Sequence, residues 1–252
     1  MSHFVNKNSI VREIWGKGDT ILFIFAGTSA EFALNKAVDW LYFTGRLPAD
    51  PLGRLFSTVG YARQIVFSST EGAHKAIDKM AHIHSAVESA RGAQIPDWAY
   101  RDVLFMLIGY SISSFEVLER KLTEAEKQEV FDVFYRVGDR MGVKDLPKNY
   151  SEWLQARDEH LQQNLAKSDL TVDLFKQYRK HLGWLRYKLL LEAQALVVPN
   201  RVKQLLGFRK ISFLTPVLLA YKLARLVELD WFLKSIVLPS EYKSERFFWK
   251  LD

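Results

Sequence analysis

Residues 68–87 read SSTEGAHKAIDKMAHIHSAV, and this stretch has the pattern of one amphipathic helix. Its apolar positions follow one another at spacings of four and three residues, the repeat of a single helix face. The stripe consists of Ala73, Ile77, Met80, His84 and Val87. His82 lies about 200° from His84 around a helix, so the two imidazoles point in different directions. The spacing predicts a helix that begins after the Ser68-Ser69-Thr70 cap and turns His84, not His82, toward the interior.

Helix signals continue on both sides of this stretch. Asp50-Pro51 is a cap followed by proline at the first helical position, and Thr123 with Glu126 forms a capping box. A buried helix is expected from Ile21 to about Tyr42, and Thr215-Pro216 is expected to start another. Strand signals are poor, with no Asn-Gly or Asp-Gly hairpin turn. We therefore predict an all-α protein built as one multi-helix domain.

Length and composition limit the protein class. The 252 residues fit one domain spanning 1–252, in which residues 209–252 form C-terminal helices packed on the rest. There is no cysteine, which excludes disulfides, thiolate metal sites and a cysteine nucleophile. The longest uncharged stretch, residues 103–115, is too short to span a bilayer, and residues 1–8 are too polar for a secretory signal. These features lead us to expect a cytoplasmic protein.

The positive charge is concentrated near the C-terminus. The formal net charge is +6, and residues 201–252 contain ten Lys and Arg against five acids. This surplus is either a solvated basic face or a surface for peripheral contact with an anionic membrane or an acidic partner. Nucleic acid is not an expected partner, because the basic residues match no known reading motif.

His84 is the leading candidate for a metal ligand. Neutral imidazole is the commonest protein ligand for haem iron, although a histidine in an apolar stripe is more often a core residue bonded to a backbone carbonyl. Glu71 and His74 form a Glu-x-x-His pair, which helical di-iron proteins use twice. No second copy occurs in the sequence, so a di-iron site is not expected.

Arg54 and Thr58 are four residues apart and share one face of the preceding helix, together with Tyr61. This face is either an ordinary solvent face or a polar strip that reaches a ligand. An arginine there could pair with a carboxylate, and a threonine could donate or accept a hydrogen bond.

Several motifs, taken in their order along the chain, resemble those of a known family of haem-dependent oxygenases. The matching elements are Asp50-Pro51-Leu52-Gly53-Arg54-Leu55, then Thr58, then a helix with His84-Ser85-Ala86-Val87; further on come Leu122–Glu126, Gly138–Gly142, Leu146-Pro147, Leu196–Pro199 and Leu205–Gly207. The sequence from about Ile10 to Phe208 is similar to the family of bacterial latex-clearing rubber oxygenases and the ER-bound fungal oxygenase MpaB. The Arg-x-x-x-Thr pair followed by the histidine is its specific part.

The resemblance implies a globin-like helical core around haem b, with His84 as the iron ligand and with Arg54 and Thr58 near the cofactor. It implies an oxygenase that activates O₂ on an apolar, isoprenoid-like substrate. Two positions depart from the rubber oxygenases. Ser57 stands where they carry a lysine before the threonine, and Phe105-Met106-Leu107 stands where a Trp-Val-His stretch is usual. Rubber itself is therefore not the expected substrate.

Two other functions remain open at this stage. A non-catalytic haem sensor or carrier would use the same helix and could close the sixth iron position with His160 or His181. A helical binding or scaffold protein could instead use the aromatic residues of the basic C-terminal segment for docking. These residues are Trp231, Phe247, Phe248 and Trp249.

Overall fold

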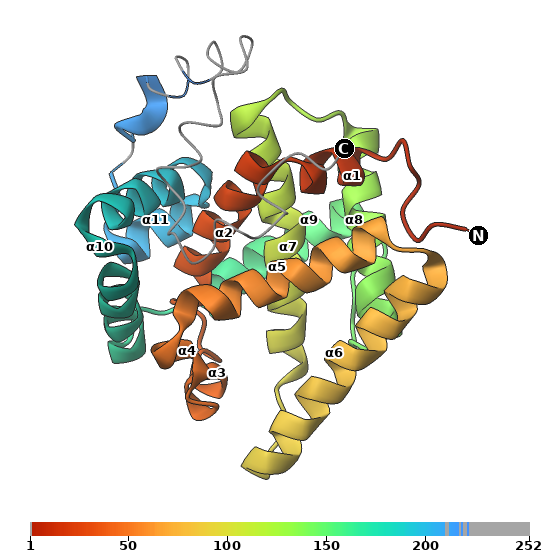
Figure 1. Ribbon diagram of the computed structural model, residues 1–252, viewed down its shortest axis with the longest axis horizontal. Helices are drawn as coiled ribbons and strands as arrows, with labels where there is room; N and C mark the ends of the chain where they lie inside the picture. Colours follow the sequence, from red (N-terminus) through yellow and green to blue (C-terminus); the bar gives the residue numbers. More distant parts are fainter. Residues whose placement is uncertain (1, 210–211, 217, 219–220, 222–252) are drawn as a thin grey trace.

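The computed structural model describes residues 2–209, 212–216, 218 and 221. This part of the chain is helical and contains no strand, only two isolated bridges between extended residues. The helices are α1 (Ile10–Gly16), α2 (Gly18–Phe32), α3 (Asp39–Phe43), α4 (Arg46–Ala49), α5 (Pro51–Phe67), α6 (Thr70–Arg91), α7 (Asp97–Leu118), α8 (Glu124–Arg140), α9 (Tyr150–Gln163), α10 (Asp169–Val197) and α11 (Asn200–Leu206) (Figure 1). The all-α prediction is confirmed.

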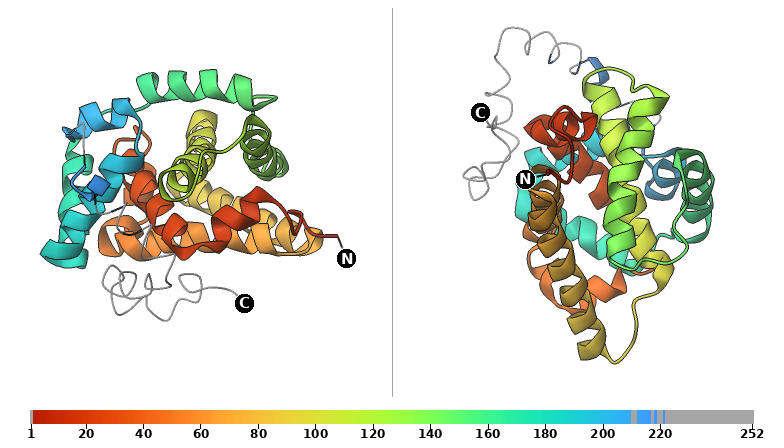
Figure 2. Two further views of the ribbon diagram at one scale, coloured as in Figure 1. Left: turned by 90° about the horizontal axis from the view of Figure 1, so that it is seen from above. Right: turned by 90° about the vertical axis from the view of Figure 1, so that its right-hand side faces the viewer.

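The helices form layers around α7. In both views of Figure 2, α9 lies on one side of α7 and α8, and α5 and α6 lie on the other. Helix α2 packs against α7, α10 and α5. Helix α7 thus has one side toward α9 and another toward α6, and it carries polar side chains on both sides.

The predicted caps define where three helices start. The Asp50 side chain accepts from the backbone N–H of Gly53 at the start of α5, and that of Ser69 accepts from Gly72 at the start of α6. At α8, Thr123 and Glu126 form the expected capping box. Each cap satisfies a backbone donor that the first helical turn leaves without a partner.

The helix predicted from Ile21 to about Tyr42 is shorter than expected. Helix α2 ends at Phe32, and α3 begins only at Asp39. Between them, the Asn35 side chain accepts from the backbone N–H of Ala37, and the N–H of Lys36 donates to the carbonyl of Asn164. The chain leaves the helix here because side-chain and long-range bonds satisfy its backbone groups.

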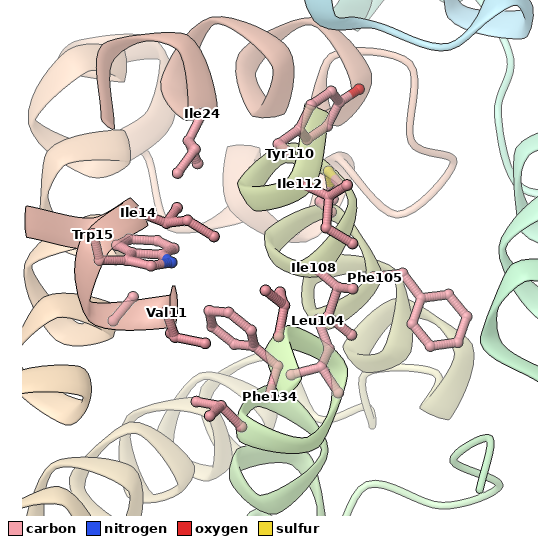
Figure 3. Packing of buried hydrophobic residues seen from close by; sticks show 14 of the residues in the cluster. Val11, Ile14, Trp15, Ile24, Leu104, Phe105, Ile108, Tyr110, Ile112 and Phe134 are labelled. Atoms are coloured by element: carbon pink, nitrogen blue, oxygen red, sulfur yellow. The ribbon is translucent and has the colours of Figure 1, made fainter. Parts of the chain in front are cut away.

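Large aromatic side chains fill the main core. Trp15 is fully buried, lies 5.8 Å from Phe134 between ring centroids, and donates its indole N–H to Ser111. Figure 3 shows the Tyr110 ring against the same cluster, with its hydroxyl directed away from it. A smaller cluster around Leu174 and Tyr178 joins α10 to α2. The described part of the chain thus has two hydrophobic clusters, a large one to which α7 contributes and a smaller one between α10 and α2.

Two expectations concern the C-terminus and the membrane. Most of residues 209–252, including most of the helix expected after Thr215-Pro216, lie outside the described residues. In the part of the chain that is described, no helix is long and apolar enough to cross a bilayer.

Gly27 of α2 lies tightly against Tyr110 of α7. A Cβ atom built on Gly27 would overlap the ring of Tyr110, which is fully buried. The ring cannot yield easily, because its hydroxyl donates to Glu31 at 2.6 Å. Glycine at this position lets the two helices pack at short range.

We expect Gly27→Ala to lower the free energy of unfolding by about 1–3 kcal/mol, as overpacking of a tight core does. The matched control is Gly60→Ala in α5, where an added Cβ meets nothing within 4 Å. This control should raise the stability by up to about 1 kcal/mol, because alanine favours a helix. Urea unfolding followed by circular dichroism measures the stability of both variants. An equal change in their free energies of unfolding would contradict the tight contact at Gly27.

Candidate functional site

Helix α6 presents His84 on its inner side. Ala73 and Ile77 are fully buried near the start of the helix, and the same stripe continues through Met80 to His84, both half-buried. His82 is exposed. The helical spacing thus predicted correctly which of the two imidazoles turns inward.

His84 has the properties of a neutral imidazole. Its ring meets the Tyr100 ring edge to face, with 5.3 Å between centroids. Burial lowers the pKa of His84, and the positive charge of Arg54 lowers it further, while Glu88 opposes them. Its Nδ1 is buried and has no hydrogen-bond partner among the residues that the structure describes. A neutral ring with an unpaired nitrogen is suited to bind a metal.

Arg54 and Thr58 lie on α5, the helix that packs against α6. The Arg54 guanidinium donates to the Thr58 hydroxyl at 3.0 Å and to the Ser57 hydroxyl at 3.3 Å. The charge of Arg54 also lowers the pKa of His84 on the neighbouring helix. Ser57, where the rubber oxygenases have a lysine, here helps to hold the arginine.

Tyr100 is a site residue that sequence reasoning missed. It lies on α7, after the loop that joins α6 to α7, so no helical spacing connects it to His84. Its hydroxyl donates to Glu88 at 3.0 Å, and the same carboxylate oxygen accepts from the backbone N–H of Ile95 at 2.9 Å. Burial and the Glu88 charge raise the pKa of Tyr100, so it stays protonated. Glu88 therefore fixes the ring that packs against His84.

A second polar cluster lies on the other side of α7. Glu31 of α2 is completely buried and accepts from both terminal nitrogens of Arg157 on α9. Tyr110 of α7 also donates to Glu31, at 2.6 Å. Burial by itself would raise the pKa of Glu31, but Arg157, His160 and Tyr110 outweigh it and lower the pKa to about 2. The carboxylate is therefore ionised at every physiological pH.

His160 extends this cluster to a second carboxylate. Its Nδ1 forms an ion pair with Asp102 of α7, and its Nε2 lies 3.5 Å from Glu31. Asn35 donates to the other Asp102 oxygen at 2.8 Å. Burial opposes protonation, yet the carboxylates of Asp102 and Glu31 raise the pKa of His160 above its ordinary value. The two carboxylates thus favour the protonated imidazole.

His160 and His181 were the candidates for a sixth iron ligand. Both ring nitrogens of His160 face carboxylates, and His181 is exposed on α10.

The cluster of Glu31, Arg157 and His160 was not predicted from the sequence. One signal was available, because Glu31 is the only acidic residue between Thr20 and Val38 in an otherwise mostly apolar stretch.

The Glu-x-x-His pair and the residues that differ from the rubber oxygenase pattern have structural roles. Glu71 pairs with Lys75 at 2.7 Å on the surface, and His74 meets Phe4 edge to face. Phe105 and Met106 are buried in the main core, and Leu107 is half-buried. Among the described residues, no group of three or more histidine and acidic side chains is arranged to hold a bare metal ion.

Comparison with known proteins gives one match. The family model for the ER-bound oxygenase mpaB/B'/Rubber oxygenase catalytic domain matches residues 17–229, further toward the C-terminus than the motifs that carry the resemblance. No curated protein and no solved structure matches the sequence.

We expect Glu31→Gln to lower the free energy of unfolding by about 3–5 kcal/mol, because it leaves the buried Arg157 without its counter-charge. Glu71→Gln is the matched control, since it removes a carboxylate from a fully exposed pair with Lys75 and should leave stability nearly unchanged. Urea titration at neutral pH measures both. Similar small losses in the two variants would contradict the role of the buried pair.

The raised pKa of His160 predicts that stability depends on pH. Its pKa is raised in the folded protein, so its stabilising contribution is complete below the unfolded value of about 6.5 and is lost as the pH rises through the folded value. The urea midpoint of the wild type should therefore fall as the pH rises above about 6.5. His160→Gln should flatten this fall, whereas His181→Gln, at an exposed site, should leave it intact. An unchanged slope in His160→Gln would rule out the cationic imidazole.

Proposed function

Because the chain belongs to the family of the mpaB and rubber oxygenase catalytic domain, we propose that it binds haem b through His84 and oxidises an apolar, isoprenoid-like molecule. The observation that carries the proposal is the neutral His84 imidazole with an unpaired ring nitrogen. One imidazole suffices for haem, because the porphyrin supplies the other nitrogens around the iron. In this proposal the helices around α7 form a globin-like core.

Haem bound through His84 would supply the chemistry that activates O₂. The residues of this chain bind and orient the cofactor. His84 stays unprotonated because of burial and the nearby Arg54 charge, so its nitrogen is free to bind iron at neutral pH. Tyr100, fixed by Glu88, packs against the ring and limits its rotation.

Arg54 is suited to hold a haem propionate. A guanidinium binds a carboxylate through two parallel hydrogen bonds, and such charge-assisted bonds are the stronger kind. The Thr58 and Ser57 hydroxyls that now accept from Arg54 keep its side chain extended along α5. We therefore assign Arg54 and Thr58 to cofactor binding rather than to the reaction itself.

The side chains that flank His84 and Tyr100 suit an apolar substrate. Met80 is one turn before His84 on α6, and Val103 and Leu107 lie on the same side of α7 as Tyr100. All three are half-buried and pack against the main core. An apolar molecule beside the haem would contact these residues and exclude water from the reacting atoms.

Two alternatives are less well supported. A non-catalytic haem sensor or carrier would use the same His84, but His160 pairs through its Nδ1 with Asp102 and comes from α9, on the other side of α7 from α6. A helical scaffold protein would need neither the neutral imidazole nor the adjacent arginine. Turnover of an isoprenoid-like substrate by the haem-loaded protein would separate the oxygenase from both.

The proposal predicts a visible spectrum that depends on His84. The wild type, produced with ample haem, should show a Soret band that shifts when CO is added to the reduced protein. His84→Ala should lose the band, whereas His82→Ala, an exposed histidine two residues away, should keep it. Arg54→Gln should raise the dissociation constant of haemin about tenfold, because a charge-assisted hydrogen bond contributes about 1.5 kcal/mol. A colourless wild type that retains its helical circular dichroism and takes up no haemin would disprove haem binding.

A further inference from the structure

Helix α10 is interrupted at Gly183. This residue has φ +71° and ψ 176°, a conformation open in practice only to glycine. An added Cβ would meet nothing within 4 Å, so the requirement for glycine comes from the backbone alone. Figure 1 shows α10 bent at the edge of the molecule, away from the N-terminus. The bend places the residues after Gly183 at the start of a new helical segment.

Two large apolar side chains follow the bend and face solvent. Trp184 is 65% exposed and Leu185 is 55% exposed. Other large hydrophobic side chains in the described part of the chain are also exposed, but none of these stands next to another in the sequence. Placing two such side chains together in water is unfavourable, and exposed apolar groups of this kind mark interaction sites.

Basic residues surround this apolar pair. The sequence from Leu174 to Leu191 contains five Lys and Arg and no acid, a net charge of +5. Four of the basic residues are exposed: Lys176, Arg179, Lys180 and Lys188. The nearest acids at either end, Asp173 and Glu192, accept hydrogen bonds from Tyr42 and Ser212. The four exposed basic residues therefore leave an excess of positive charge on this stretch.

We propose that Trp184 and Leu185, together with Lys176, Arg179, Lys180 and Lys188, form a docking surface for an anionic lipid membrane. We call these six residues the α10 patch. Tryptophan prefers the boundary between headgroups and acyl chains, and leucine adds apolar area buried there. The lysines and the arginine would contact lipid phosphates, with their alkyl stems against the membrane surface.

The charge of the patch selects among possible occupants. A second copy of the chain would bring a second cluster of positive charge against the first, so self-association through this face is opposed. A nucleic acid would neutralise the charge but would leave Leu185 in water. An anionic membrane suits both the basic and the apolar residues of the patch, because it has negative phosphates and an apolar interior.

The test is sedimentation of the full-length protein with lipid vesicles. The wild type should bind vesicles of equimolar phosphatidylcholine and phosphatidylglycerol, should bind pure phosphatidylcholine far more weakly, and should dissociate as salt is raised. Arg179→Gln with Lys180→Gln should weaken binding about fivefold for each charge removed. Trp184→Ala with Leu185→Ser should weaken it at least tenfold, through the loss of buried apolar area.

Two control variants match these changes on other surfaces. Lys144→Gln with Lys148→Gln removes two exposed charges before α9, and Leu154→Ser removes an exposed leucine on α9. Both should bind the vesicles like the wild type. Every variant keeps the basic C-terminal segment, so its contribution is the same in all of them.

Three outcomes would overturn the proposal. The first is no binding of the wild type to anionic vesicles. The second is equal binding by the α10 variants and the controls, which would place the contact elsewhere, such as in residues 201–252. The third is a dimer, or a complex with nucleic acid, that depends on Trp184 while vesicle binding does not. None of these readouts requires haem, so failure here is distinguishable from failure of the proposed function.

Discussion

The buried carboxylate of Glu31 is the interaction on which the rest of the structure depends. It comes from α2 and is balanced by Arg157 of α9 and by the Tyr110 hydroxyl of α7. A buried anion without these partners would be strongly destabilising, so the three helices must meet in one arrangement to satisfy it. His160 and Asp102 extend the same requirement along α7 and α9. The cluster thus selects one relative position of helices that apolar packing alone would specify less sharply.

This constraint reaches the proposed haem site through α7. Asp102 and Tyr100 are two residues apart, on nearly opposite sides of that helix. One is held by His160 and Asn35, and the other packs against His84. Fixing α7 on the α9 side therefore also fixes the ring that His84 meets on the α6 side. Glu88 completes the link by tying the end of α6 to the start of α7.

The positive charges fall into two groups with different consequences. Arg157 and His160 are inside and paired with carboxylates, where they contribute to the packing of the core. Lys176, Arg179, Lys180 and Lys188 of α10 are exposed, on either side of an exposed tryptophan and leucine in the sequence. Paired interior charge helps to define the fold, and the exposed charge of α10 supports the membrane contact that we propose. An oxygenase for apolar molecules would gain from such a surface, because its substrates concentrate in lipid.

The sequence by itself determined the helical class, the starts of α5, α6 and α8, and the choice of His84 over His82, because caps and helical periodicity act over a few residues. It also indicated the family, through Arg54, Thr58 and His84. Only the tertiary structure decided that α2 ends at Phe32, that Tyr100 meets His84, and that Glu31 pairs with Arg157 across 126 positions. These features depend on contacts between helices, which local spacing does not encode.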